Sequence, residues 1–306
     1  MLVSPLSAHS LFDYVSFEGP DAIEFLQGQV TCDVQKLSAE RSVVGALCNL
    51  KGRVVADFRL VLLSNNSILL QTSAGNGEKI LNTLQRYAVF SKVDLAKVPG
   101  PAAVFGVIGE QADAALQEVF DNLPTEPHSV ITTDDFSVMR SAGSRARFEV
   151  WCHSQDAVTA LTRLDVMEEV GSIEDWARAD IEAGIAHVNA NQSEEFTPQL
   201  LNYDISGIVD FEKGCYTGQE VVARMYYRGK AKKRLYRVHS GDDLSTELAQ
   251  TKLREADQAI EVVSAAPPSD SPSIALAIVN TEYAKQSLEG DNTAQLQIEE
   301  LVYSEN

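Results

Sequence analysis

The sequence has few of the side chains on which metal and redox sites depend. Its 306 residues include only four cysteines, which lie far apart: Cys32, Cys48, Cys152 and Cys215. They form no CxxC pair and no Cys/His cluster at zinc spacing, and an iron–sulfur cluster needs about four thiolates. We therefore expect no resident metal site, although one cysteine can still act as a ligand shared with a partner.

Signals for membrane insertion and for export are also missing. No apolar run approaches the roughly 20 residues that span a bilayer. The N-terminus, MLVSPLSAHSLFDY, lacks the cationic region and the continuous apolar core of a signal peptide. We therefore predict a cytoplasmic protein with no membrane partner.

Several catalytic and nucleotide-binding signatures are absent as well. The chain has no GxGxxG pattern, no phosphate-binding GxxxxGK(S/T) loop and no nucleophile elbow. The histidines show no HxxxH or His–carboxylate spacing, so we assign them no role: His9, His128, His153, His187 and His239.

Positive charge is scarce. The 25 basic and 44 acidic side chains give a net charge of −19, and nucleic-acid affinity rests largely on basic groups that neutralise phosphates. The exception is residues 224–237, which contain seven basic residues and no acidic one. This stretch predicts either a solvated basic strand pair or a local anion site. The anion site would be formed by Arg228, Lys230, Lys232 and Lys233.

Composition and pattern predict an α+β protein of two or three domains. A hydrophobic content of 44% and a charged content of 23% are ordinary for a globular chain. Residues 1–100 predict a unit of helices and antiparallel strands, and residues 101–228 repeat this pattern after the Pro99–Pro101 break. Residues 229–306 contain short strands between polar, Pro-rich connections, which predict a small β-barrel.

The densest group of unusual residues is the stretch Lys213 to Arg224. Thr217 and Glu220 have the spacing of a capping box, so a helix is expected from about Gly218. A helix N-terminus carries about half a positive charge. That charge and Lys213 both favour the thiolate form of Cys215, which is the nucleophilic and metal-binding form. The alternative is a well-capped helix with a small buried cysteine. The remaining residues of this loop are Gly214, Tyr216, Gly218, Gln219 and Arg224.

Two other residues, one acidic and one aromatic, are candidates for a functional site. Asp57 lies on the mostly apolar odd-numbered face of a predicted strand, with Arg59 two residues further on. It is either a functional acid or base or a structural carboxylate paired with Arg59. Trp176 follows a capping pair, Ser172 and Asp175, and is either a core aromatic or a stacking platform.

Several of these stretches together resemble a known family. The string KGCYTGQEVVAR with the following Arg228-Gly229 is similar to the signature of the YgfZ family, folate-binding and tRNA-modifying proteins related to the glycine-cleavage aminomethyltransferase. The resemblance covers nearly the whole chain. It includes residues 25–31, 87–92, 181–184 and 196–199.

The resemblance implies a fold, a ligand and partners. The fold would be an aminomethyltransferase-like folate-binding body with a C-terminal β-barrel. The ligand would be tetrahydrofolate or a related folate, whose carboxylate tail suits the basic stretch. The role would be assembly or repair of iron–sulfur enzymes, such as a tRNA methylthiotransferase, and hence support of tRNA methylthiolation. Direct tRNA binding is not expected, because the chain is acidic.

The resemblance also assigns roles to single residues. Asn49 to Asp57 is similar to the transferase segment whose final Asp is catalytic beside the folate N5, but Ala56 and Arg53 depart from that pattern. Trp176 matches the folate-site tryptophan, and Phe12 stands where a second folate-site aromatic is expected. Glu149 resembles the pterin-binding glutamate, although strand alternation favours an exposed position.

We therefore predict a folate-binding accessory or regulatory protein in which Cys215 faces the folate cleft or a partner. Three alternatives remain open. The chain is a folate-dependent aminomethyl or one-carbon transferase, a tRNA-binding module working through residues 224–237, or a scaffold without a ligand.

Overall fold

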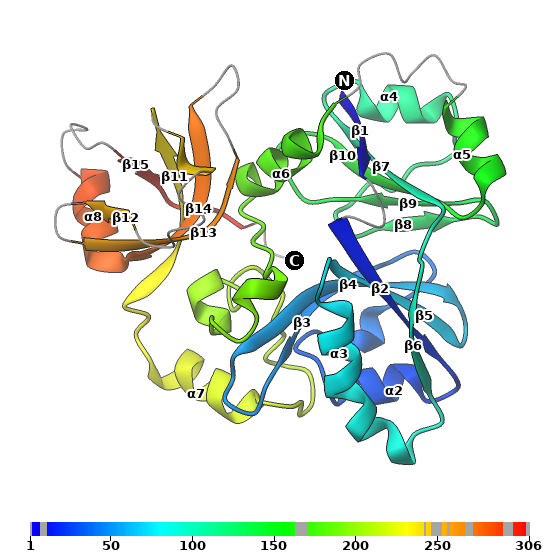
Figure 1. The fold of residues 1–306 in the computed structure, drawn as a ribbon, viewed down its shortest axis with the longest axis horizontal. Helices are drawn as coiled ribbons and strands as arrows, with labels where there is room; N and C mark the ends of the chain where they lie inside the picture. The colour runs from blue at the N-terminus through cyan, green and yellow to red at the C-terminus, as the bar shows by residue number, and fades with distance from the viewer. Residues whose placement is uncertain are drawn as a thin grey trace.

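Three five-stranded sheets build the molecule (Figure 1). A computed structural model describes residues 2–6, 11–162, 171–241, 243–245, 253–255, 258–266, 272–289 and 296–303. All strand pairs within these ranges are antiparallel. The sheets therefore fit the α+β class that the sequence predicts.

The first sheet has the order β3-β4-β5-β2-β6. Its strands are β2 (Phe12–Glu18), β3 (Val43–Cys48), β4 (Val54–Ser64), β5 (Ser67–Ser73) and β6 (Asp94–Val98). Helices α2 (Ala22–Gln27) and α3 (Gly77–Leu84) accompany it, with short 3-10 turns at Val34–Lys36 and Gln85–Phe90. Their apolar faces bury a core that includes Phe17, Leu26 and Ile80. Strands β2, β3 and β4 are rich in β-branched and aromatic residues, which favour extended structure.

The second sheet has the order β1-β7-β10-β9-β8. Its strands are β1 (Leu2–Leu6), β7 (Ala103–Ile108), β8 (Val130–Thr132), β9 (Phe136–Arg140) and β10 (Arg147–Cys152). Helices α4 (Ala112–Gln117), α5 (Gln155–Thr162) and α6 (Ile173–Glu182) accompany it. The N-terminal strand β1 pairs with β7, so residues 2–6 lie in this sheet although they are far from it in sequence.

The third sheet has the order β12-β13-β14-β11-β15. Its strands are β11 (Lys233–Ser240), β12 (Leu253–Glu255), β13 (Gln258–Ala266), β14 (Ser273–Asn280) and β15 (Leu296–Glu299). Helix α8 (Thr281–Glu289) follows β14 directly. Among the described residues β12 and β15 do not pair, so the sheet is open and the predicted barrel is not confirmed. The sequence prediction also missed α8.

A segment without strands connects the three sheets. It contains 3-10 turns at Ala190–Gln192 and Pro198–Leu201 and helix α7 (Gln219–Arg228). Its buried side chains Phe196, Tyr203 and Val222 share one core with Cys48 of the first sheet and Ile278 of the third. Figure 1 shows this segment between the sheets. No helix within the described ranges is long and apolar enough to cross a membrane.

Candidate functional site

A cavity of about 640 Å³ lies where the first two sheets meet the connecting segment. Its wall comes from β4, β5, β10, α6, the 183–187 loop and the C-terminal Val302 and Tyr303. The structure brings four of the predicted positions to this wall: Phe12, Asp57, Glu149 and Trp176. Their positions agree with one shared site, while their roles stay predictions.

Asp57 is buried on β4, opposite Ala46 of β3. Its Oδ1 accepts a hydrogen bond from the Val188 amide at 2.7 Å, and its Oδ2 accepts one from the His187 Nδ1–H at 2.6 Å. Arg59 does not pair with it and instead donates to the Ser42 hydroxyl at 3.1 Å. The structural alternative of an Asp57–Arg59 pair is therefore wrong.

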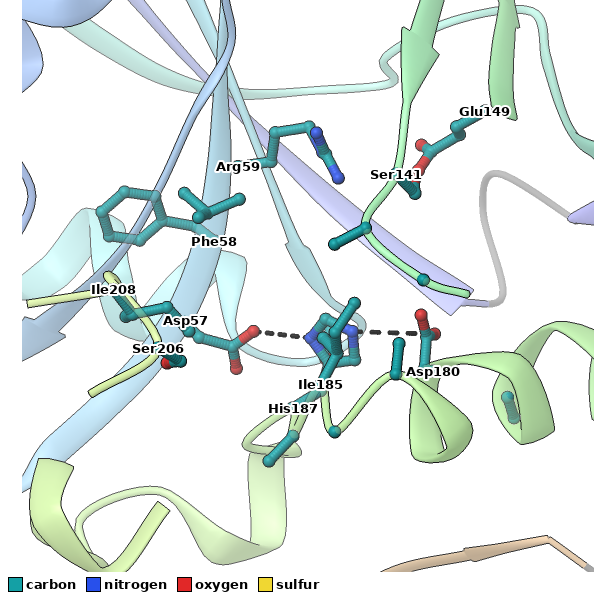
Figure 2. A pocket seen from close by; sticks show the side chains of 18 of the residues that line it. Asp57, Phe58, Arg59, Ser141, Glu149, Asp180, Ile185, His187, Ser206 and Ile208 are labelled. Atoms are coloured by element: carbon teal, nitrogen blue, oxygen red, sulfur yellow. Dashed lines mark hydrogen bonds and ion pairs between the residues drawn. The ribbon is translucent and has the colours of Figure 1, made fainter. Parts of the chain in front are cut away.

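His187 lies between two carboxylates (Figure 2). Its Nε2 is 3.8 Å from Asp180 Oδ2, on the side away from Asp57. Partial loss of solvent at the cavity wall lowers the pKa of His187, but the charge and hydrogen bond of Asp57 and the charge of Asp180 outweigh it, raising the pKa from 6.5 to about 9. Sequence reasoning gave His187 no role because Asp57 is 130 residues away. No spacing pattern could signal a contact at that separation.

Arg147 connects Asp180 to Trp176. Its Nη2 donates to Asp180 Oδ1 at 2.5 Å, and its guanidinium lies 4.5 Å from the centroid of the Trp176 ring. Trp176 is buried against Gly106, where a Cβ would approach the indole to 2.3 Å. The predicted Ser172–Asp175 capping box at the start of α6 is confirmed. Trp176 is therefore both a core residue and part of the cavity wall.

Glu149 is buried rather than exposed, so the expectation from strand alternation is wrong. It lies on β10, the central strand of the second sheet, and every residue of this strand is buried. Its Oε1 accepts from Gln71 Nε2 and from Trp151 Nε1, each at 2.6 Å. Its Oε2 accepts no hydrogen bond from any described residue, so this oxygen remains an acceptor for a ligand.

Other polar atoms at the cavity wall also lack partners among the described residues. They are His128 Nδ1 and Ser141 Oγ, both buried. Burial, together with the positive charges of Arg59 and Arg41, lowers the pKa of His128 from 6.5 to about 3. Buried polar atoms without partners are costly in a folded protein, and a bound polar ligand would satisfy them. In the described ranges, no three His, Cys, Asp or Glu side chains cluster as metal ligands do.

The Cys215 loop differs from its prediction in two ways. The capping box is wrong: α7 begins at Gln219 after Gly218, whose φ is +83°, and Glu220 pairs with Arg224 at 2.9 Å. The Thr217 hydroxyl donates instead to Gln29 Oε1 at 3.0 Å. The physical reason is the close passage of Gly218 over Asn49, where a Cβ would lie 2.4 Å from the carbonyl oxygen. This contact sets the turn.

Cys215 itself is exposed and does not line the cavity. The alternatives of a buried structural cysteine and of a thiol facing the cleft are therefore wrong, while a thiol that faces a partner stays a prediction. Lys213 is buried, and its ammonium donates to the carbonyl oxygens of Gln27 and Val30. The ammonium group that was predicted to stabilise the thiolate is thus hydrogen-bonded to backbone carbonyls of residues 1–100, the first unit.

The basic stretch divides into two groups. Arg224, Arg234 and Arg237 pair with acids, the last two with Asp204 and Glu299. Within the described part of the chain the other four are exposed and without an ion pair: Arg228, Lys230, Lys232 and Lys233. None of these four lines the cavity. Their positions therefore do not support the prediction that these basic residues bind the carboxylate tail of a ligand held in the cavity.

Comparisons with known proteins agree with the geometry. The GCVT N-terminal domain family matches residues 6–165. The tRNA-modifying protein YgfZ of Yersinia pseudotuberculosis is 34% identical over 98% of this chain and 93% of its own length. Its counterpart in Yersinia enterocolitica is 33% identical with the same coverage. Among solved structures, the glycine cleavage system aminomethyltransferase T of Bartonella henselae matches with a TM-score of 0.73 at 18% identity, covering 98% of this chain and 85% of the other. The fold is therefore aminomethyltransferase-like, and the chain belongs to the YgfZ family.

Proposed function

We propose that this protein binds a reduced folate, such as tetrahydrofolate, in the cavity and supports iron–sulfur enzymes of tRNA modification in the cytoplasm. The observation that carries the proposal is the wall of the 640 Å³ cavity. It combines an aromatic surface, buried carboxylates and cations. Specific small-molecule sites in proteins are typically concave, mostly apolar and supplied with a few placed polar groups.

The residues of the wall fit a folate by their chemistry. A pterin ring has N–H donors, and the buried Glu149 carboxylate receives hydrogen bonds from the described residues at Oε1 only. The same ring has a flat π face, which suits the aromatic side chains of Trp176 and Phe12. A reduced folate supplies an amine nitrogen that can carry a one-carbon unit. In this proposal Glu149 and Trp176 bind and orient it, and Asp57 supports the same part of the cavity wall.

The position of Cys215 supports a role at a protein partner rather than at the folate. The thiol is exposed, and Lys213, Thr217 and Gly218 hold its loop against the first unit. Such a thiol can meet an iron–sulfur client, for example a tRNA methylthiotransferase. The accessory role is therefore preferred to a transferase reaction of the protein's own.

Two other functions fit the structure less well. A folate-dependent one-carbon transferase would use Asp57 as its base, but both Asp57 oxygens already accept hydrogen bonds. Direct tRNA binding would use the unpaired cations near α7, against a net charge of −19. We expect tRNA binding to be weak and without the steep salt dependence of phosphate contacts.

Calorimetric titration with tetrahydrofolate under reducing conditions tests the ligand. We expect saturable binding together with quenching of tryptophan fluorescence. Trp176→Phe keeps an aromatic platform, so binding should persist while the quenching falls. Trp151→Phe is the control for the fluorescence signal: Trp151 does not line the cavity, so quenching of Trp176 should persist. Its affinity is not compared, because Trp151 donates a hydrogen bond to Glu149. The absence of saturable heat with tetrahydrofolate would exclude the folate proposal.

A further inference from the structure

Asp57 does not present a free carboxylate to the cavity. Both of its oxygens accept hydrogen bonds, from the Val188 amide and from His187. The side chain of His187 is 50% exposed, compared with 9% for Asp57. The group that a ligand meets at this position is therefore the imidazole.

We propose that His187 contacts the ligand through its Nε2–H and that Asp57 is a positioning residue that acts through His187. The identity of the ligand as a folate rests on the proposed function. The assignment of the contacting group rests on the geometry of the Asp57–His187 pair.

Charged groups from β4, α6 and β10 surround His187. Strand β4 supplies Asp57, whose bond to Nδ1 fixes the ring orientation, and also Arg59, whose charge opposes protonation of the ring. Helix α6 supplies Asp180, which lies 3.8 Å from Nε2. Strand β10 supplies Arg147, which is bonded to Asp180 and reduces its negative field. The two carboxylates prevail over Arg59, so the ring is held as an imidazolium at neutral pH.

The open atom of this imidazolium is Nε2. Among the described residues it has no acceptor within hydrogen-bond distance, because 3.8 Å to Asp180 Oδ2 is an ion-pair distance only. A ligand oxygen, from a carbonyl or a carboxylate, can accept this proton. Asp180 beside it can accept from a neighbouring N–H of the same ligand. A pterin ring carries a carbonyl oxygen next to a ring N–H, so it offers both groups.

A bond from a charged donor is stronger than one from a neutral donor. Affinity for tetrahydrofolate should therefore be constant at neutral pH and fall as pH rises through about 9, where His187 loses its proton. His187→Gln keeps a side chain with an N–H but no titrating group. We expect about tenfold weaker binding at neutral pH, typical of losing one charge-assisted hydrogen bond, and no pH dependence near 9.

Asp57→Asn separates positioning from contact. Without the carboxylate, the ring should titrate at a lower pH, and the midpoint of the affinity profile should move down with it. The titration of the His187 ring carbon, followed by NMR in the protein alone, gives the same midpoint without any ligand. Thermal unfolding of both variants shows whether they are folded before binding is compared.

The possible outcomes separate the two proposals. If tetrahydrofolate binds the wild type but its affinity does not respond to pH or to His187→Gln, the inference is overturned and the folate function stands. If His187 titrates near 6.5 in the wild-type protein, the positioning role of Asp57 is overturned. If tetrahydrofolate does not bind at any pH, the folate function and the proposed contact fail together.

Discussion

The ammonium group of Lys213 donates a hydrogen bond to the carbonyl oxygen of Val30 at 2.7 Å, across 183 residues of sequence. A second bond from the same group reaches Gln27, also in the first unit. Two residues further along the chain, Cys215 is exposed. The hydrogen bonds of Lys213 thus hold the loop against the first unit, while the thiol of Cys215 stays exposed to solvent. The position of the thiol therefore depends on contacts with the first unit, which lies far away in sequence.

Lys213→Met should destabilise the protein, because it keeps the apolar stem and removes the ammonium. Two carbonyl oxygens would lose a charged donor, and burying unsatisfied polar groups costs about 1–3 kcal/mol. We expect a drop of about 2 kcal/mol in the free energy of unfolding, measured by urea titration. Lys51→Met is the control, because Lys51 is exposed. Equal stability of the two variants would contradict the anchoring role of Lys213.

Gly218→Ala should be destabilising and Gly214→Ala should not. Gly218 has a φ of +83°, and a Cβ there would lie 2.4 Å from the Asn49 carbonyl oxygen. A left-handed conformation alone costs a non-glycine residue about 1–2 kcal/mol, and the clash adds to it. At Gly214 a Cβ would meet no atom within 4 Å. Urea titration of both variants checks this, and a stable Gly218→Ala would mean that the turn is not needed.

The two predicted capping boxes show how far local sequence patterns reach. Ser172 and Asp175 form theirs: the Ser172 hydroxyl accepts from the Asp175 amide, and the Asp175 carboxylate accepts from the Ser172 amide. Thr217 and Glu220 have the same spacing but do not form one. There the contact between Gly218 and Asn49 sets the turn, and that contact joins residues far apart in sequence. Local patterns therefore predicted the strands and most helices well, but not the details imposed by distant contacts.

The residues of the candidate site could be predicted only where the family resemblance assigns a role to a position. The resemblance named Asp57, Trp176, Phe12 and Glu149, and the structure places all four at one cavity. Residue patterns alone could not do this, since alternation suggested an exposed Glu149. They also could not find His187, because its partner lies on a strand 130 residues earlier. Pairings between distant segments are a property of the fold and leave no periodic signal.

Native-state alkylation should modify Cys215 and spare the other three cysteines. Cys32, Cys48 and Cys152 are buried, and burial raises the pKa of each thiol to about 12. The reactive species is the thiolate, so these three should react only after unfolding. Mass spectrometry of iodoacetamide-treated protein, native and in urea, measures this. Labelling of a buried cysteine in the native protein would contradict the structure.

Cys215→Ser should leave stability within about 0.5 kcal/mol of the wild type, as is usual for an exposed position. In cells that lack the wild-type gene, this variant should fail to restore methylthiolation of tRNA, measured by mass spectrometry of tRNA nucleosides. Cys152→Ser is the control for function, because Cys152 is buried on β10 of the second sheet. Full restoration by Cys215→Ser would exclude a role of the thiol at the client.

Two histidines of the cavity should give stability opposite dependences on pH. The pKa of His187 is raised to about 9, so its contribution is complete below about 6.5 and is lost as pH rises through 9. The pKa of His128 is lowered to about 3, so its contribution is present above about 6.5 and is lost as pH falls towards 3. Urea titrations from pH 5 to pH 9.5 measure the free energy of unfolding, which should fall on both the acidic and the alkaline limb of the pH profile.

Matched variants assign each limb to its residue. His187→Gln should flatten the alkaline limb and leave the acidic one, because only the first involves the imidazolium beside Asp57. His128→Asn should flatten the acidic limb, and asparagine suits the position because the φ of His128 is +69°. The backbone bonds of His128 to Arg140 and Ser42 are available to any residue. If His187→Gln left the alkaline limb unchanged, the Asp57–His187 pair would not be the group that titrates there.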